Sequence, residues 1–327
     1  MTGLSDSFQR PINYLRISVT DRCNLRCIYC MPSEGVNLMS HNDILSYEEI
    51  YAVVRAAAEM GITKVRLTGG EPLVRAGLPG LVQMIASTDT IDDISLTTNG
   101  TLLAQYAAEL KEAGLQRVNV SLDTLKPDRF KHVTRCGNLE DTLKGIEVAI
   151  AVGLNPVKIN VVVMSGVNDD ELPDFAAKTI SEGWHVRFIE LMPLNGDDPV
   201  VSRLVSVSEM KHRLDPIGKM EPCRVSVGNG PAKYFRFPNA TGTIGFITPV
   251  TEHFCYQCNR LRLTADGKLR PCLLSEEEID LRETLRRGAS SVELKDLIEE
   301  AIARKPMCHQ LAEGSKHKGR PFSQVGG

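Results

Sequence analysis

The chain has 327 residues, of which 42% are hydrophobic and 24% are charged, as in globular proteins with a packed core. Its formal net charge of −3 argues against a general polyanion-binding protein, so an anionic ligand must be held by local cations. Because the sequence has no run of about 18 apolar residues and no apolar leader, we expect no membrane span, no signal peptide and a cytoplasmic location.

The first two thirds of the chain alternate short apolar runs with amphipathic segments, which predicts βα units around a parallel sheet. Ser46 and Glu49 form a capping-box signal at the start of the first helix, and Gly61 follows its end. We expect about six such units, fewer than the eight of a closed TIM barrel, and hence a partial barrel. The predicted strands are 14–20, 64–68, 93–97, 117–121, 155–164 and 185–192, and the predicted helices are 46–60, 78–86, 102–113, 139–152 and 170–183.

The pattern changes after about residue 199, and proline and glycine become frequent between residues 216 and 249. Short strands are predicted at 234–237, 243–247 and 260–264, and a helix is predicted at 292–304. We therefore predict an α/β fold in which residues 1–199 form the partial barrel and residues 200–327 form a smaller C-terminal region.

One face of the predicted strands is polar, although parallel strands covered by helices are usually apolar on both faces. Drift of strand ends into loops explains some of these positions, but Arg16, Arg66 and Lys158 lie well inside their strands. Because a buried cation without a partner is costly, we expect an anionic ligand inside the barrel. The alternating polar positions are Arg16, Ser18, Thr20, Arg66, Thr68, Ser95, Thr97, Asn99, Asn119, Ser121, Asp123, Lys158 and Asn160.

Most of the nine cysteines fall into two tight sets, which favours metal binding over disulfides in a chain without a secretion signal. The first set, Cys23, Cys27 and Cys30, follows the first strand with C-x3-C-x2-C spacing. Three thiolates suit a [4Fe–4S] cluster with one open iron. A zinc site completed by a distant histidine such as His41 is the alternative.

The second set, Cys255, Cys258 and Cys272, has C-x2-C-x13-C spacing, and Arg260 and Arg262 alternate on a strand within it. A second open cluster beside two guanidinium groups would bind a phosphorylated substrate through iron and charge. A zinc site completed by Cys308 or His309 is the alternative. We interpret the cysteines outside the two sets as structural, namely Cys136, Cys223 and Cys308.

Several motifs carry a family resemblance. The first cysteine set, the segment Thr68-Gly69-Gly70-Glu71-Pro72 and Ser121 resemble those of radical S-adenosylmethionine (SAM) enzymes, although the glycine-rich segment alone is also typical of an ordinary βα turn. With Thr97-Thr98-Asn99-Gly100, the second cysteine set and the terminal Gly326-Gly327, the whole chain resembles the GTP 3′,8-cyclases, the family of molybdenum cofactor biosynthesis protein A.

This resemblance implies a role for each motif residue. The first cysteine set would hold a [4Fe–4S] cluster that binds SAM, and the second set would hold a [4Fe–4S] cluster whose open iron takes the guanine of GTP. SAM would be contacted by Tyr29, Gly70, Ser121 and Met192. GTP would be bound by Arg16, Arg66, Thr97, Lys158, Arg260 and Arg262. The expected catalytic residues are Arg260, Arg262, Gly326 and Gly327.

The resemblance also implies an activity and partners. The enzyme would be a lyase that converts GTP to (8S)-3′,8-cyclo-7,8-dihydroguanosine 5′-triphosphate through a 5′-deoxyadenosyl radical, the first step of molybdenum cofactor biosynthesis. It would need an external electron donor and would pass its product to the cyclic pyranopterin monophosphate synthase. We expect a monomer or homodimer that binds neither membrane nor nucleic acid.

Two alternative functions stay open at this point. One is a two-cluster radical SAM enzyme that modifies a peptide or protein, although such enzymes generally have more C-terminal cysteines than the three here. The other is a non-catalytic iron–sulfur or zinc protein that binds RNA through Arg260 and Arg262. The acidic net charge and the aromatic content of 5% argue against the second, because single-strand binding relies on basic grooves and stacking side chains.

Overall fold

The computed structural model describes residues 3–192, 204–224, 230–309, 320 and 322–326, and the statements below concern these residues. They contain one curved sheet of twelve strands in the order β12-β11-β10-β1-β2-β3-β4-β5-β6-β9-β8-β7. The strands are β1 (Tyr14–Ser18), β2 (Lys64–Thr68), β3 (Asp93–Thr98), β4 (Arg117–Ser121), β5 (Lys158–Val163), β6 (His185–Glu190), β7 (Glu221–Pro222), β8 (Lys233–Arg236), β9 (Thr243–Ile247), β10 (Arg260–Leu263), β11 (Lys268–Arg270) and β12 (Ile279–Asp280).

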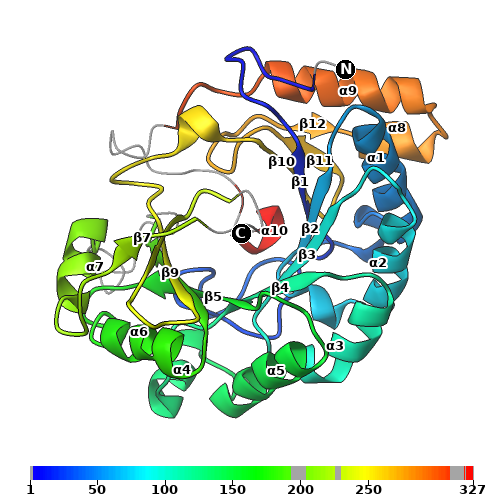
Figure 1. Cartoon of the computed structure of the whole chain (residues 1–327). Coiled ribbons are helices and arrows are strands. Elements are labelled where there is room, and N and C mark those ends of the chain that lie inside the picture. Colours follow the sequence, from blue (N-terminus) through cyan, green and yellow to red (C-terminus); the bar gives the residue numbers. More distant parts are fainter. Residues whose placement is uncertain (1–2, 193–203, 225–229, 310–319, 321, 327) are drawn as a thin grey trace.

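Most of the helices cover the outer side of this sheet, whereas the short C-terminal helix lies inside the barrel (Figure 1). The helices are α1 (Tyr47–Glu59), α2 (Leu78–Ala86), α3 (Leu103–Glu112), α4 (Pro127–Thr134), α5 (Leu139–Ala151), α6 (Leu172–Ser181), α7 (Val207–Leu214), α8 (Arg282–Arg286), α9 (Ser291–Ala303) and α10 (Phe322–Val325). The capping box predicted for α1 is present, with the Ser46 hydroxyl accepting from the Glu49 amide at 3.1 Å and the Glu49 carboxylate accepting from the Ser46 amide at 2.7 Å.

Strands β1 to β6 run parallel in chain order, as predicted. Two strands from the C-terminal part extend this parallel set, because β9 pairs with β6 and β10 pairs with β1. The sheet ends at β7 and β12 and is therefore open, which confirms the partial barrel. The division at residue 199 stays a prediction, and strands from both sides of it share the one sheet.

The two faces of the sheet differ in chemistry. The outer face packs against buried residues of α1, α2, α3, α5 and α6 in one hydrophobic cluster, and the alternate, inner positions carry the polar residues singled out in the sequence. The outer residues, each at most 2% exposed, are Leu15, Ile17, Val65, Leu67, Ile94, Leu96, Val118, Val120, Ile159, Val161, Val186 and Phe188.

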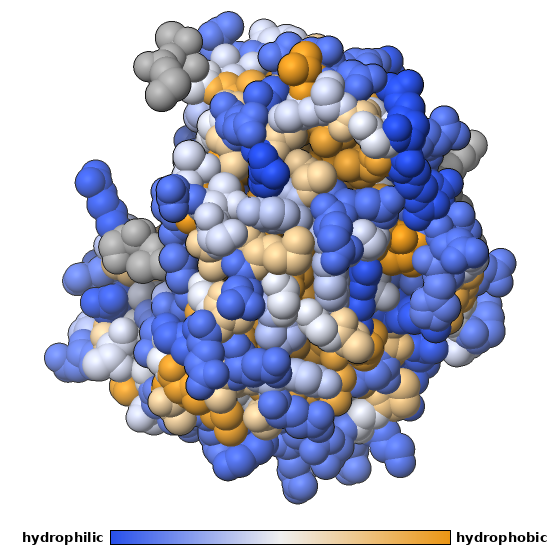
Figure 2. All heavy atoms as spheres, turned by 90° about the vertical axis from the view of Figure 1, so that its right-hand side faces the viewer, coloured by the Kyte–Doolittle hydropathy of each residue, from blue (hydrophilic) through white to orange (hydrophobic). Residues whose placement is uncertain are grey.

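One helix-covered face of the molecule is mainly hydrophilic (Figure 2). Figure 2 shows the face at the right of Figure 1, where hydrophilic side chains dominate and hydrophobic ones are scattered. None of the described helices is long and apolar enough to cross a membrane.

Candidate active site

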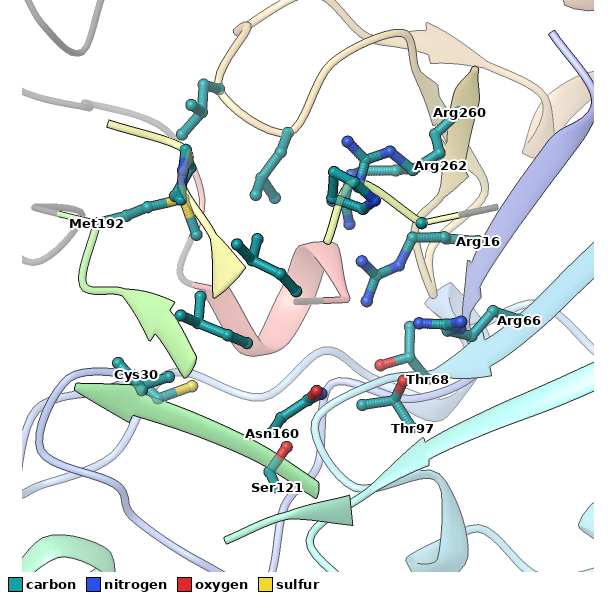
Figure 3. Close-up of a pocket in the computed structure, with 18 of the residues that line it drawn as sticks. Arg16, Cys30, Arg66, Thr68, Thr97, Ser121, Asn160, Met192, Arg260 and Arg262 are labelled. Atoms are coloured by element: carbon teal, nitrogen blue, oxygen red, sulfur yellow. The ribbon is translucent and has the colours of Figure 1, made fainter. Parts of the chain in front are cut away.

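The inner face of the sheet borders a pocket of about 310 Å³, a volume within the usual range for small-molecule sites. All six cysteines of the two sets line it. Figure 3 shows arginines on one side of this pocket and Cys30 and Met192 on the other. The remaining predicted residues that line it are Arg16, Tyr29, Arg66, Gly70, Thr97, Ser121, Met192, Arg260 and Arg262.

The loop that carries the first cysteine set is fixed by the glycine-rich segment after β2. The Gly70 amide donates to the Thr20 carbonyl at 2.7 Å, and the Glu71 amide donates to the Arg22 carbonyl at 2.8 Å. A Cβ atom on Gly70 would lie 2.3 Å from the Arg22 carbonyl oxygen. Glycine is therefore required at this position because the backbone lies against the cysteine loop itself. The sequence also predicts that Gly70 contacts SAM.

Glu71 connects this loop to the segment after β3. Its carboxylate is buried and accepts hydrogen bonds from the Thr98 hydroxyl and the Asn99 amide, each at 2.7 Å, and from the Leu73 amide at 3.1 Å. Burial raises the pKa of Glu71 to about 7, against the effect of these hydrogen bonds. The Asn99 side chain in turn donates to the Asn24 side chain at 2.8 Å, so the segments after β2 and β3 together hold the loop of the first cysteine set.

Tyr29, predicted to contact SAM, is held from the opposite wall. Its hydroxyl donates to Asp123 Oδ2 at 2.8 Å, and Asp123 Oδ1 accepts from the Val162 amide at 2.8 Å. Burial raises the pKa of Asp123 to about 6. The ring of Tyr29 is thus tied to the carboxyl ends of β4 and β5, where ligands of parallel sheets usually bind.

Three arginines lie side by side on the inner face. Arg16 on β1 is in register with Arg66 on β2 and with Arg262 on β10. Burial, Arg262 and Arg66 lower the pKa of Arg16 well below its usual value, and burial lowers the pKa of Arg66 and of Arg262 to about 10. Like charges at neighbouring positions of a sheet repel one another, so this row favours binding of an anion.

Other polar groups on the inner face also point to a ligand. Within the described part of the chain, Thr97 Oγ1, Asn160 Oδ1 and Arg187 Nε are buried without a hydrogen-bond partner. Buried polar atoms are normally paired, so an unpaired group in a pocket is a candidate ligand contact. Arg187 is the main pocket residue that the sequence analysis missed, although it continues the polar alternation onto β6.

Lys158 is the predicted GTP-binding residue that does not line the pocket. It is 2% exposed, its ammonium lies 5.7 Å from the centre of the Tyr234 ring, and it is in register with Asn119 on β4. Burial and the charges of Arg187, Arg117 and Arg66 lower the pKa of Lys158 to about 7. Lys158 thus adds to the positive charge near the pocket without forming its wall.

The second cysteine set lies beside β10. Arg260 Nη2 donates to Cys258 Sγ at 3.7 Å. Burial raises the pKa of Cys258, but the charges of Arg260 and Lys305 outweigh this effect and lower the pKa to about 6. A lowered pKa favours the thiolate form, which metal binding requires. Pro271, next to Cys272, and His309 also line the pocket, whereas Cys308 is exposed.

The donor set of each cysteine group fits an iron–sulfur cluster. All three thiols of each set line the pocket, and three thiolates leave one iron of a [4Fe–4S] cluster open for a ligand. Within the described ranges, no group of three His, Cys, Asp or Glu side chains is arranged to hold a single metal ion.

Gly326, close to the C-terminus, contacts residues that line the same pocket. Helix α10 lies in the middle of the barrel (Figure 1), and the Gly326 carbonyl accepts from Arg262 Nη1 at 2.5 Å. A Cβ atom on Gly326 would lie 2.7 Å from Thr68 Cγ2. Gly327, the other predicted tail residue, lies outside the described residues.

The radical SAM superfamily model matches residues 17–178, and the Molybdenum Cofactor Synthesis C model matches residues 184–311. A protein from Pelotomaculum thermopropionicum named GTP 3′,8-cyclase is 54% identical over 326 residues, covering 99% of this chain and 100% of that protein. One of the same name from Desulforamulus reducens is 52% identical over 324 residues, covering 98% and 99%.

Among solved structures, Streptococcus suis SuiB bound to S-adenosylmethionine has a TM-score of 0.62 at 14% identity and covers 88% of this chain and 68% of that chain, which shows the fold. The family resemblance expected from the motifs is confirmed by the relatives, which match the chain from end to end. The chain therefore belongs to the GTP 3′,8-cyclase family within the radical SAM superfamily.

Proposed function

We propose that this chain is a radical SAM GTP 3′,8-cyclase, which converts GTP to (8S)-3′,8-cyclo-7,8-dihydroguanosine 5′-triphosphate in the first step of molybdenum cofactor biosynthesis. The observation that carries the proposal is a single pocket lined by two sets of three cysteines and by Arg16, Arg66, Arg187, Arg260 and Arg262. The relatives and the two family models support this activity over the peptide-modifying and RNA-binding alternatives.

In this proposal each cysteine set holds one [4Fe–4S] cluster, and the first set also brings SAM to the pocket. Tyr29, Gly70, Ser121 and Met192 bind SAM, since all four line the pocket that the first cysteine set also lines. When bound, the cluster and SAM supply one-electron cleavage of a sulfonium and a carbon radical that can take a hydrogen atom from the substrate. The protein must supply orientation, because such a radical attacks whatever lies nearest.

The cations orient GTP. The row Arg262-Arg16-Arg66 offers neighbouring guanidinium forks, which suit the oxygens of a triphosphate. The Gly326 carbonyl holds the Arg262 guanidinium in place, while Arg260 lies next to the second cysteine set, where the guanine would bind. Among the described residues the Thr97 hydroxyl has no hydrogen-bond partner and is free to contact GTP, and Lys158 adds positive charge near the pocket without lining it.

The partners form part of the same proposal. An external one-electron donor reduces the clusters, and the product passes to the cyclic pyranopterin monophosphate synthase. The expected cytoplasmic location is consistent with both partners.

The test is an anaerobic assay of reconstituted, reduced protein with GTP and SAM. We expect about eight iron atoms per chain, four for each cluster, together with 5′-deoxyadenosine and a cyclised nucleotide. Cys258→Ala should abolish the cyclised nucleotide, and Cys223→Ala is the matched control, because Cys223 lies outside both sets. Zinc in place of iron, or the absence of both products, would contradict the proposal.

A further inference from the structure

Lys305 lies behind the second cysteine set. It follows α9, is 3% exposed and does not line the pocket. Its ammonium donates to the carbonyl oxygens of Arg260 at 2.8 Å and Pro271 at 2.5 Å. Arg260 follows Cys258 by two residues, and Pro271 directly precedes Cys272, so one side chain links the segments that carry two of the three cysteines.

Arg10 makes the matching contact to the third cysteine. Its Nη1 donates to the carbonyl oxygen of Cys255 at 2.7 Å and to that of Met307 at 2.9 Å, and its Nη2 donates to that of Pro306 at 2.8 Å. Residues 305–307 and Arg10 therefore join the backbone at or beside all three cysteines.

The two cations differ in how their charge is balanced. Arg10 forms an ion pair with Asp6 at 2.5 Å. For Lys305, the hydrogen bonds to described residues go only to neutral carbonyl groups. Burying an ammonium group that has only neutral carbonyl partners costs free energy. We therefore expect a negative charge near Lys305 that offsets this cost.

The nearby negative charge belongs to the second cysteine set. Burial lowers the pKa of Lys305, whereas Cys258 and Cys272 raise it. Three thiolates outweigh the charge of an oxidised cubane core, so the loaded site is anionic. Arg260 also contacts this set through Cys258 Sγ, and Arg262 lies near it, but both arginines line the pocket, where a substrate can share their charge.

We propose that Lys305 is the counter-cation of the second iron–sulfur cluster and that Lys305 and Arg10 together position its three cysteines. The inference rests on the proposed function, because that function assigns a cluster to Cys255, Cys258 and Cys272. Charge and hydrogen bonding around a cluster set its reduction potential. A fixed positive charge stabilises the reduced, more negative form, so Lys305 makes this cluster easier to reduce.

The test uses the full-length chain with Cys23, Cys27 and Cys30 replaced by alanine, so that only the second cluster remains. Its reduction potential is measured by anaerobic redox titration followed by electron paramagnetic resonance. Lys305→Gln keeps an N–H donor but removes the charge, and we expect a more negative potential. Lys305→Arg keeps the charge, and Arg304→Gln removes an adjacent exposed cation that pairs with Glu277 and Glu300; both should leave the potential unchanged.

A second readout compares thermal unfolding of cluster-loaded and cluster-free protein. Lys305→Gln should lower the unfolding temperature more in the loaded form, because only that form contains the charge that Lys305 offsets. The inference is overturned if Lys305→Gln leaves the reduction potential unchanged, or if Lys305→Arg shifts the potential equally. It is also overturned if Lys305→Gln lowers the unfolding temperature equally in the loaded and cluster-free forms. Loss of the cluster from Lys305→Gln but not from Lys305→Arg supports it, and loss from both variants overturns it. If the parent chain itself holds no iron, the proposed function fails instead.

Discussion

Replacing Arg66 by methionine should weaken GTP binding and, at the same time, stabilise the ligand-free protein. Arg66 lies in register between Arg16 on β1 and Ser95 on β3, and its Nε donates to the Ser95 hydroxyl at 3.1 Å. Methionine keeps most of the aliphatic length but removes the charge. The two effects have opposite signs because a buried positive charge destabilises the ligand-free protein but stabilises the complex with an anion.

The magnitudes follow from burial and charge. Burial lowers the pKa of Arg66 from 12.5 to about 10, which makes its charged form less favourable by up to ~3 kcal/mol at 1.36 kcal/mol per pKa unit. Loss of the Ser95 hydrogen bond offsets about 1 kcal/mol of this, so we expect a net gain of about 1–2 kcal/mol. Loss of charge-assisted hydrogen bonds to phosphate should cost ~1.5–3 kcal/mol of binding, or roughly 10- to 150-fold in affinity.

Equilibrium binding of GTP and thermal unfolding without GTP measure the two effects on protein of equal iron content. Arg66→Lys is the matched variant: it keeps the charge, so it should lose less affinity than methionine and gain less stability. A methionine variant that binds GTP as tightly as the parent, or that unfolds at a lower temperature, would refute the reasoning.

Three further predictions concern other parts of the site. Gly326→Ala should displace the tail from Thr68 and lower the ratio of cyclised nucleotide to 5′-deoxyadenosine, whereas Gly288→Ala, also at positive φ but in open space, should not. Glu71→Gln replaces one acceptor oxygen by a donor, so it should cost about 1–3 kcal/mol in thermal unfolding and lower the iron content of the first cluster; unchanged unfolding would contradict this. The pKa of Lys158 is lowered to about 7, so above that pH Lys158 must take up a proton when GTP binds. The Kd for GTP should therefore rise by up to about tenfold per pH unit between pH 7.5 and 9. If Lys158→Met shows the same pH dependence of the Kd, Lys158 is not the group responsible.

Much of the barrel was predictable from local patterns. The bounds of β2, β4, α2 and β9 agree with the prediction, since each is a short apolar or amphipathic run with clear ends. Strand β5 begins at Lys158 and not at residue 155, because Pro156 lacks the amide donor that a strand interior needs. Helices α4 and α7 were not predicted; both are short and have low mean hydropathy, so they contain few apolar residues to mark them in the sequence.

The long-range pairings had no local signal. Pairing of β10 with β1 joins segments about 245 residues apart, and only this register places Arg262 beside Arg16. Arg16, Arg66, Arg260 and Arg262 were nevertheless predictable, because alternation within a strand is a local property, whereas Arg187 was missed. By contrast, Lys305 follows a helix, and among the described residues it hydrogen-bonds only backbone carbonyl groups, so nothing in its sequence context marks it.

The same pairing explains how two distant cysteine sets come to face one pocket. The first set follows β1, and the second set brackets β10, which is the neighbour of β1 in the sheet. Parallel pairing orients both strands alike, so the inner face of β10 continues the inner face of β1. A chain that ended before β9 would keep the first cysteine set, Tyr29 and Glu71, but it would leave β1 and β6 as exposed edges and lose Arg260 and Arg262. We therefore expect the SAM-binding half to be unable to hold the triphosphate by itself, because the cations that complete the row come from the other end of the chain.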